Sequence, residues 1–150
     1  MAFIHEHIIL PLSDWATNQN VYRDMRFLKQ SEQWSEQQML DFRCVKLRDI
    51  ANRAIEHVPY YQDLGLERDS IRTFEDLRKL PIVSKQIIRE QGLTRFASDC
   101  YPASKRIKLN SSGSTGEPFT YYTSPEATSI NTAAKLLTWY KAGYRLGNRY

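Results

Sequence analysis

The clearest periodic pattern begins after Ser35. Apolar residues then recur at intervals of three and four positions, at Leu40, Cys44, Leu47, Ala51, Ala54 and Val58. This spacing places an apolar stripe along one face of a helix. Ser35 followed by Gln38 has the pattern of a capping box, and Pro59 disfavours continuation of the helix. The sequence therefore predicts a long helix over residues 36–57, with Cys44 as a small core residue rather than a nucleophile.

Shorter helices are predicted from their capping residues. Thr73 precedes a helix over 74–79, and Ser84 and Gly92 enclose another over 85–91. Ser124 followed by a proline predicts the start of a helix over 125–142, which Gly143 ends. Residues 1–34 show no clear period, so we expect a segment that wraps the surface, with one short helix around 21–28.

A strand pattern follows the helices. Residues 105–110 alternate apolar and basic side chains, and residues 119–123 are aromatic or β-branched. These runs predict a hairpin, with a third strand beginning near 149–150. So small a sheet is marginal by itself. The fold class is thus a helix-rich α/β fold with an incomplete sheet, and we expect the chain to be the N-terminal portion of a longer protein, truncated at Tyr150.

The predicted hairpin carries an unusual connection. Six consecutive positions hold four hydroxyls and two glycines, followed closely by Pro118: Ser111, Ser112, Gly113, Ser114, Thr115 and Gly116. Glycine permits close backbone approach to a ligand, and successive backbone N–H groups form a nest for an anion. A polyphosphate fits this chemistry best. A flexible Ser/Gly linker is the alternative, but the chain has only 6 glycines, so this pair is not part of a general richness in glycine. The segment matches neither a Walker A loop nor G-x-G-x-x-G.

Composition narrows the class of protein. Apolar residues make up 41% of the chain and charged residues 25%, which is typical of a soluble globular protein. The net charge of +4 is mild and its cations are interspersed with acids, which disfavours a nucleic-acid-binding domain. One dense basic cluster, Lys105, Arg106 and Lys108, either guards an edge strand or draws an anion toward the loop.

Other classes of site are disfavoured. The 2 cysteines, Cys44 and Cys100, do not make a disulfide framework, and no Cys/His pair has the spacing of metal ligands. The histidines at positions 5, 7 and 57 are too scattered to indicate zinc, so no metal site is predicted. The apolar run at 8–10 is too short for a signal peptide or a membrane span, which favours a cytoplasmic protein.

The hydroxyl- and glycine-rich segment resembles the phosphate-binding loop of adenylate-forming enzymes, the acyl-CoA synthetase superfamily. Within it, the chain is most similar to the phenylacetate–CoA ligase branch and its CapK-like relatives in polysaccharide biosynthesis. Four further segments resemble that branch in the same order: FLKQSEQWS at 27–35, HVPYY at 57–61, FEDLRKLPIVSK at 74–85 and GYRLGNR at 143–149. The resemblance thus covers nearly the whole chain.

The resemblance implies an ATP-dependent enzyme that joins a small carboxylic acid to coenzyme A through an acyl-adenylate, with Mg²⁺ at the phosphates. It implies three parts: a wrapping segment at 1–34, a helical subdomain at 35–104 and the start of the nucleotide-binding core at 105–150. By position, the ATP phosphates would be bound by Ser111, Ser112, Gly113, Ser114, Thr115 and Gly116, with Thr115 nearest the metal. The catalytic residues would lie beyond Tyr150, so we expect the chain alone to lack ligase activity and to bind ATP weakly.

Two residues depart from the family pattern. Glu117 stands where many relatives have lysine, and Asn148 stands where the family usually has aspartate. A carboxylate beside a triphosphate repels it by about 1 kcal/mol at 4 Å in water. Both departures favour the alternative function, a non-catalytic phosphate- or nucleotide-binding module of the same fold, whereas the intact set of hydroxyls favours the enzyme. Tyr60, Tyr61 and Lys85 also match family positions. We interpret them as structural, the tyrosines packing against the long helix and Lys85 as a residue in the first turn of its helix.

Overall fold

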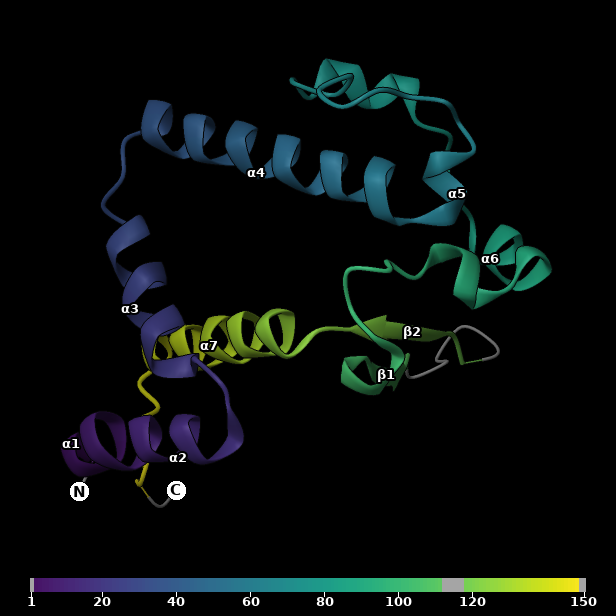
Figure 1. Cartoon of the computed structure of the whole chain (residues 1–150). Helices are drawn as coiled ribbons and strands as arrows, with labels where there is room; N and C mark the ends of the chain where they lie inside the picture. Colours follow the sequence, from purple (N-terminus) through teal and green to yellow (C-terminus); the bar gives the residue numbers. More distant parts are fainter. Residues whose placement is uncertain (1, 112–117, 149–150) are drawn as a thin grey trace. The chain divides into compact units, whose positions relative to one another are not determined.

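The computed structural model describes residues 2–111 and 118–148 (Figure 1). Contacts group the chain into two units, one formed by residues 1–34 and 123–150 and the other by residues 35–122. The helix after the hairpin is grouped with the N-terminal residues. The three segments predicted from the sequence stay a prediction. No helix in the described ranges is long and apolar enough to cross a membrane.

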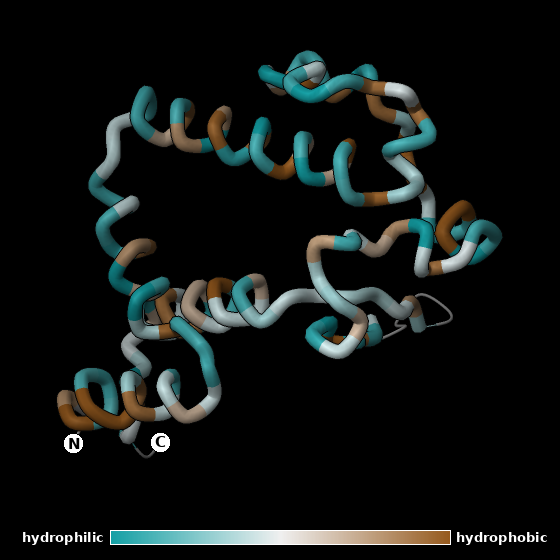
Figure 2. The backbone as a smooth tube through the Cα atoms, viewed as in Figure 1, coloured by the Kyte–Doolittle hydropathy of each residue, from teal (hydrophilic) through white to brown (hydrophobic). Residues whose placement is uncertain are grey.

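The first unit is helical. A continuous helical run consists of α1 (Ala2–Ile4), the π-helix η1 (His5–Ile9) and α2 (Leu10–Thr17), followed by α3 (Val21–Ser31) and α7 (Pro125–Lys141). The N-terminal segment is therefore more regular than its sequence pattern indicated. Its apolar residues face solvent in part, as at Trp15, which is 84% exposed, and Figure 2 shows their hydrophobic character near the N-terminus.

The core of the first unit lies between α3 and α7. Its buried apolar side chains are Val21, Met25, Ala133, Leu136 and Tyr140. Three polar side chains, Asp14, Asp24 and Ser129, are buried beside them. The Asp14 carboxylate accepts the backbone N–H of Tyr22 at 2.8 Å, so a residue of α2 satisfies a donor in the first turn of α3.

The second unit begins with α4 (Glu36–His57) and α5 (Pro59–Gln62). The predicted capping box at Ser35 and Gln38 is present, which confirms the long helix. Only the C-terminal half of its apolar stripe is deeply buried, against Ile71, whereas Leu40 is exposed and Cys44 half-buried. The periodicity of apolar residues therefore predicted the helix correctly. It overestimated how much of the apolar stripe is buried by the described residues.

Short elements follow: η2 (Glu75–Lys79), α6 (Lys85–Gln91), η3 (Leu93–Phe96) and η4 (Ala103–Lys105). Ser84 caps α6 through the Ile87 N–H at 3.2 Å, as predicted. The helix predicted after Thr73 is instead a 3₁₀-helix, and its cap is reversed. The Asp76 carboxylate accepts the backbone N–H and the hydroxyl of Thr73, because a carboxylate three positions on reaches both donors.

The hairpin consists of β1 (Ile107–Asn110) and β2 (Thr120–Thr123), which form a two-stranded antiparallel sheet. The helix-rich mixed α/β class predicted from the sequence is thus present in its coarse form. Ser124 caps α7 through the Ala127 N–H at 3.2 Å, and the left-handed Gly143 follows its end, as predicted. The third strand predicted near 149–150 lies outside the described residues.

Candidate functional site

The hydroxyl-rich connection is closed at its base by one residue pair. The backbone N–H of Ser111 donates to the Phe119 carbonyl at 2.8 Å, and the Ser111 hydroxyl accepts the Phe119 N–H at 2.9 Å. Beside this pair, the Thr120 hydroxyl donates to the Asn110 side-chain oxygen at 2.8 Å. Ser111 therefore fixes the ends of the connection, and its hydroxyl retains its own proton for donation to a ligand.

The other predicted phosphate ligands, Ser112, Gly113, Ser114, Thr115 and Gly116, lie outside the described residues, as does Glu117. Their role in phosphate binding stays a prediction. Asn148 is described, and its backbone N–H donates to the Arg145 carbonyl at 3.1 Å in a turn after α7.

A cleft of about 180 Å³ adjoins the base of the connection, lined by Ile88, Arg89, Leu93, Pro118, Phe119 and Thr120. The ammonium of Lys85, the first residue of α6, lies 6.0 Å from the centre of the Phe119 ring. Two cationic side chains thus lie on α6 near the residues that close the connection. Such an arrangement favours an anion electrostatically.

The tyrosines of the HVPYY segment serve packing. The Tyr60 ring lies 4.4 Å from that of Phe96 in η3 and 5.2 Å from that of Tyr61, measured between centroids. Burial, followed by the neighbouring Tyr60, raises the pKa of Tyr61. The contact between Tyr60 and Phe96 connects α5 to η3. It supports a packing role for Tyr60, whereas the expected packing of the two tyrosines against the long helix stays a prediction.

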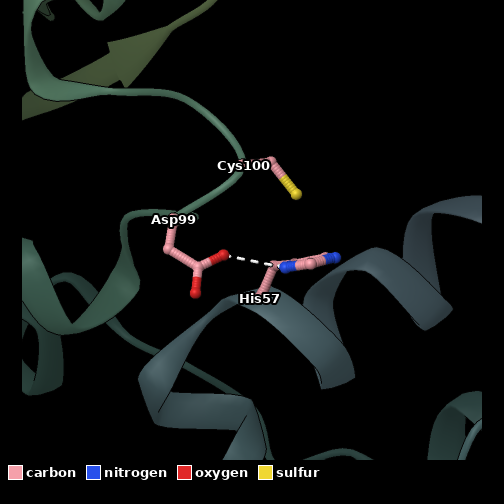
Figure 3. A group of neighbouring side chains, drawn as sticks. All are labelled: His57, Asp99 and Cys100. Atoms are coloured by element: carbon pink, nitrogen blue, oxygen red, sulfur yellow. Dashed lines mark hydrogen bonds and ion pairs between the residues drawn. The ribbon is translucent and has the colours of Figure 1, made fainter.

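A second group of chemically active side chains lies at the end of α4 (Figure 3). His57 is the last residue of α4, and Asp99 and Cys100 belong to the loop after η3. His57 Nδ1 and Asp99 Oδ1 are 2.8 Å apart, and the Asp99 backbone N–H donates to the His57 carbonyl at 2.9 Å. One donor atom from each of the three residues lies within 4.8 Å of the others.

Sequence reasoning missed this group, because it compared the spacing of residues along the chain. His57 and Asp99 are 42 positions apart, far outside the short spacings of common zinc motifs. The adjacent Asp99 and Cys100 pair was the only local signal, and by itself it does not indicate a site.

The comparison with known proteins adds no identification. No protein-family model matches the chain, and none of the curated proteins compared with it gives a significant match.

Proposed function

We propose that the chain is the N-terminal portion of an ATP-dependent carboxylate–CoA ligase of the adenylate-forming superfamily, similar to phenylacetate–CoA ligases and to CapK-like enzymes of polysaccharide biosynthesis. The observation that supports it best is the position of the hydroxyl- and glycine-rich segment. It connects the two strands of a hairpin, and the reciprocal hydrogen bonds of Ser111 and Phe119 close its base. A linker would not require such closure.

In the proposed first step, a carboxylate oxygen of the acid forms a bond to the α-phosphorus of ATP while the bond to pyrophosphate breaks. In the second, the sulfur of coenzyme A attacks the acyl carbon and AMP leaves. The task of this chain would be to bind the β- and γ-phosphates through the hydroxyls and N–H groups of residues 111–116. Charge that develops on the leaving pyrophosphate would be stabilised by these fixed donors.

Magnesium would arrive with the nucleotide. The described residues of the hairpin, 107–111 and 118–123, offer hydroxyl and amide oxygens but no carboxylate. Such a donor set fits an ion that is bound mainly by substrate phosphates and water, as Mg²⁺ commonly is. When bound, Mg²⁺ would neutralise phosphate charge, and Thr115 is the hydroxyl we expect nearest to it.

The test is acid-dependent exchange between ATP and labelled pyrophosphate, catalysed by the product of the complete reading frame. We expect exchange with a panel of aryl and alkyl carboxylic acids. Thr115→Ala should lower it by about a hundredfold or more, since loss of one donor to developing charge commonly costs about 10²–10³ in rate. Ser104→Ala removes an exposed hydroxyl outside the connection and should leave exchange unchanged. No exchange with any acid would overturn the ligase assignment.

The same preparation separates the alternative function. Glu117 favours a module that binds phosphate without catalysis. For such a module, calorimetry would detect binding of tripolyphosphate, and Thr115→Ala would weaken this binding. The module would give no exchange with any acid. For the chain of residues 1–150 alone, we expect weak ATP binding and no exchange. Turnover by this chain at the rate of a complete ligase would contradict the expected location of the catalytic residues.

A further inference from the structure

We propose that His57, Asp99 and Cys100 form a zinc site. The three side chains come from two segments, the end of α4 and the loop after η3, and their donor atoms converge to within 4.8 Å. In Figure 3 the carboxylate and the thiol both extend from the loop toward the imidazole. The inference rests on this geometry and does not depend on the proposed ligase function.

The separations suit a small ion after limited adjustment. Zinc binds imidazole nitrogen and carboxylate oxygen at about 2.0–2.2 Å and thiolate sulfur at about 2.3 Å, so tetrahedral ligand atoms lie roughly 3.4–3.6 Å apart. The 2.8 Å hydrogen bond between His57 and Asp99 would open by several tenths of an ångström, and Cys100 would approach. Rotation about side-chain bonds supplies such movements without displacing the backbone.

The mixture of donors selects the metal. A thiolate disfavours Mg²⁺ and Ca²⁺, which take oxygen ligands, whereas sulfur, nitrogen and oxygen together are typical of Zn²⁺. The His57 and Asp99 side chains are 39% and 67% exposed, so an ion can enter from solvent and water can complete the tetrahedron. Cys100 would bind as thiolate, releasing its proton to solvent.

The backbone around the ligands is held in place before any ion binds. Besides the bond from Asp99 to the His57 carbonyl, the Cys100 N–H donates to the Ser98 hydroxyl at 3.2 Å. The Arg106 guanidinium donates to the carbonyls of Tyr101 at 2.9 Å and Ser98 at 2.8 Å. Ligands on a fixed backbone lose less freedom when they bind a metal.

The end of α4 adds a favourable field. His57 is the last residue of this 22-residue helix, whose dipole places partial negative charge at the C-terminal end. A cation bound there is stabilised by that charge. The bound ion would also cross-link the helix end to the loop, and so we expect Zn²⁺ to raise the melting temperature of the second unit.

The test uses Co²⁺ as a spectroscopic substitute for Zn²⁺ on the purified chain. We expect one equivalent of Co²⁺ to give a thiolate-to-cobalt charge-transfer band and visible bands of tetrahedral intensity, both abolished by excess Zn²⁺. Cys100→Ser should abolish the charge-transfer band, and His57→Gln and Asp99→Asn should weaken Co²⁺ binding at least tenfold. Cys44→Ser, which removes the other cysteine, is the matched control and should leave the spectrum unchanged.

A measurement on the unaltered chain keeps the test independent of variant folding. Alkylation by iodoacetamide, followed by peptide mass spectrometry, reports on each thiol. One equivalent of Zn²⁺ should slow modification of Cys100 at least tenfold and leave Cys44 unaffected. The proposal is overturned if Zn²⁺ protects neither thiol or protects both equally, or if the Co²⁺ band persists in Cys100→Ser.

Discussion

Replacement of Ser129 by alanine should strongly destabilise the first unit. Ser129 lies on α7 with only 1% of its surface exposed. Its hydroxyl donates to Asp24 Oδ2 at 2.9 Å and accepts the backbone N–H of Asn20 at 3.0 Å. The Ser129 side chain thus joins α7 to α3 and to Asn20, the residue before α3. Both partners lie more than a hundred positions from Ser129 along the sequence.

The magnitude follows from the two hydrogen bonds. A bond to a charged carboxylate contributes about 1.5–3 kcal/mol, and one between neutral groups about 0.5–1.5 kcal/mol. Alanine regains about 0.5 kcal/mol as a better helix former than serine. Ser129→Ala should therefore lower the free energy of unfolding by about 1.5–4 kcal/mol, because it leaves a buried carboxylate oxygen and a backbone N–H without their partner.

Tryptophan fluorescence during urea unfolding measures this effect selectively. All 3 tryptophans, Trp15, Trp34 and Trp139, belong to the first unit. Thr138→Ala is the control on the same helix, since its exposed hydroxyl donates only to the Ala134 carbonyl at 3.0 Å, and its effect should stay within about 0.5 kcal/mol. If Ser129→Ala costs no more than the control, the argument from buried hydrogen bonds is refuted.

Two further predictions concern pH and backbone conformation. A hydrogen bond from Lys79, followed by backbone N–H groups, holds the pKa of Asp76 well below its usual range. Stability from this carboxylate is therefore present above its unfolded pKa of about 4 and is lost as pH falls through the folded value. Asp76→Asn should lower the melting temperature, measured by circular dichroism, at pH 7 but not in strong acid. An equal loss of melting temperature at the two pH values would contradict the link between ionisation of Asp76 and stability. Gly147 has φ +81°, and a Cβ there would clash with the His5 ring, whereas Gly143 has φ +93° and open space around the position of a Cβ. Gly147→Ala should therefore destabilise the first unit by about 1 kcal/mol or more, and more than Gly143→Ala does in the fluorescence assay; equal losses would exclude the close contact as a cause.

Local signals in the sequence predicted the helix starts well. Ser35, Ser84 and Ser124 each cap the expected helix through a bond from the N–H three positions on. The hairpin was also predictable, because its alternation and its turn residues lie within one short segment. In each case the interacting groups are close in sequence, so residue type and spacing contain the needed information.

Long-range polar contacts were not predictable by the same means. Periodicity assigns polar residues to the solvent face, yet Ser129 and Asn52 are buried because each meets a partner from a distant segment. Asn52 exchanges two hydrogen bonds with Asp69, which adopts the left-handed φ of +60°. The proximity of His57 and Cys100 is another long-range contact of this kind, because it results from the path of the chain and not from the spacing of the residues in sequence.

The basic cluster at the start of the hairpin, Lys105, Arg106 and Lys108, shows how such contacts change a functional interpretation. From the sequence we expected Arg106, together with Lys105 and Lys108, either to protect the strand edge or to attract an anion toward the loop. In the structure its guanidinium donates to the carbonyls of residues 98 and 101, on either side of Asp99 and Cys100. Neutralising Arg106 would therefore remove both a positive charge and the hydrogen bonds that hold the loop of the proposed zinc ligands, so its effect on phosphate binding would not isolate electrostatic attraction. Lys108, exposed on β1, is the cation whose removal tests electrostatic attraction to the connection without disturbing that loop.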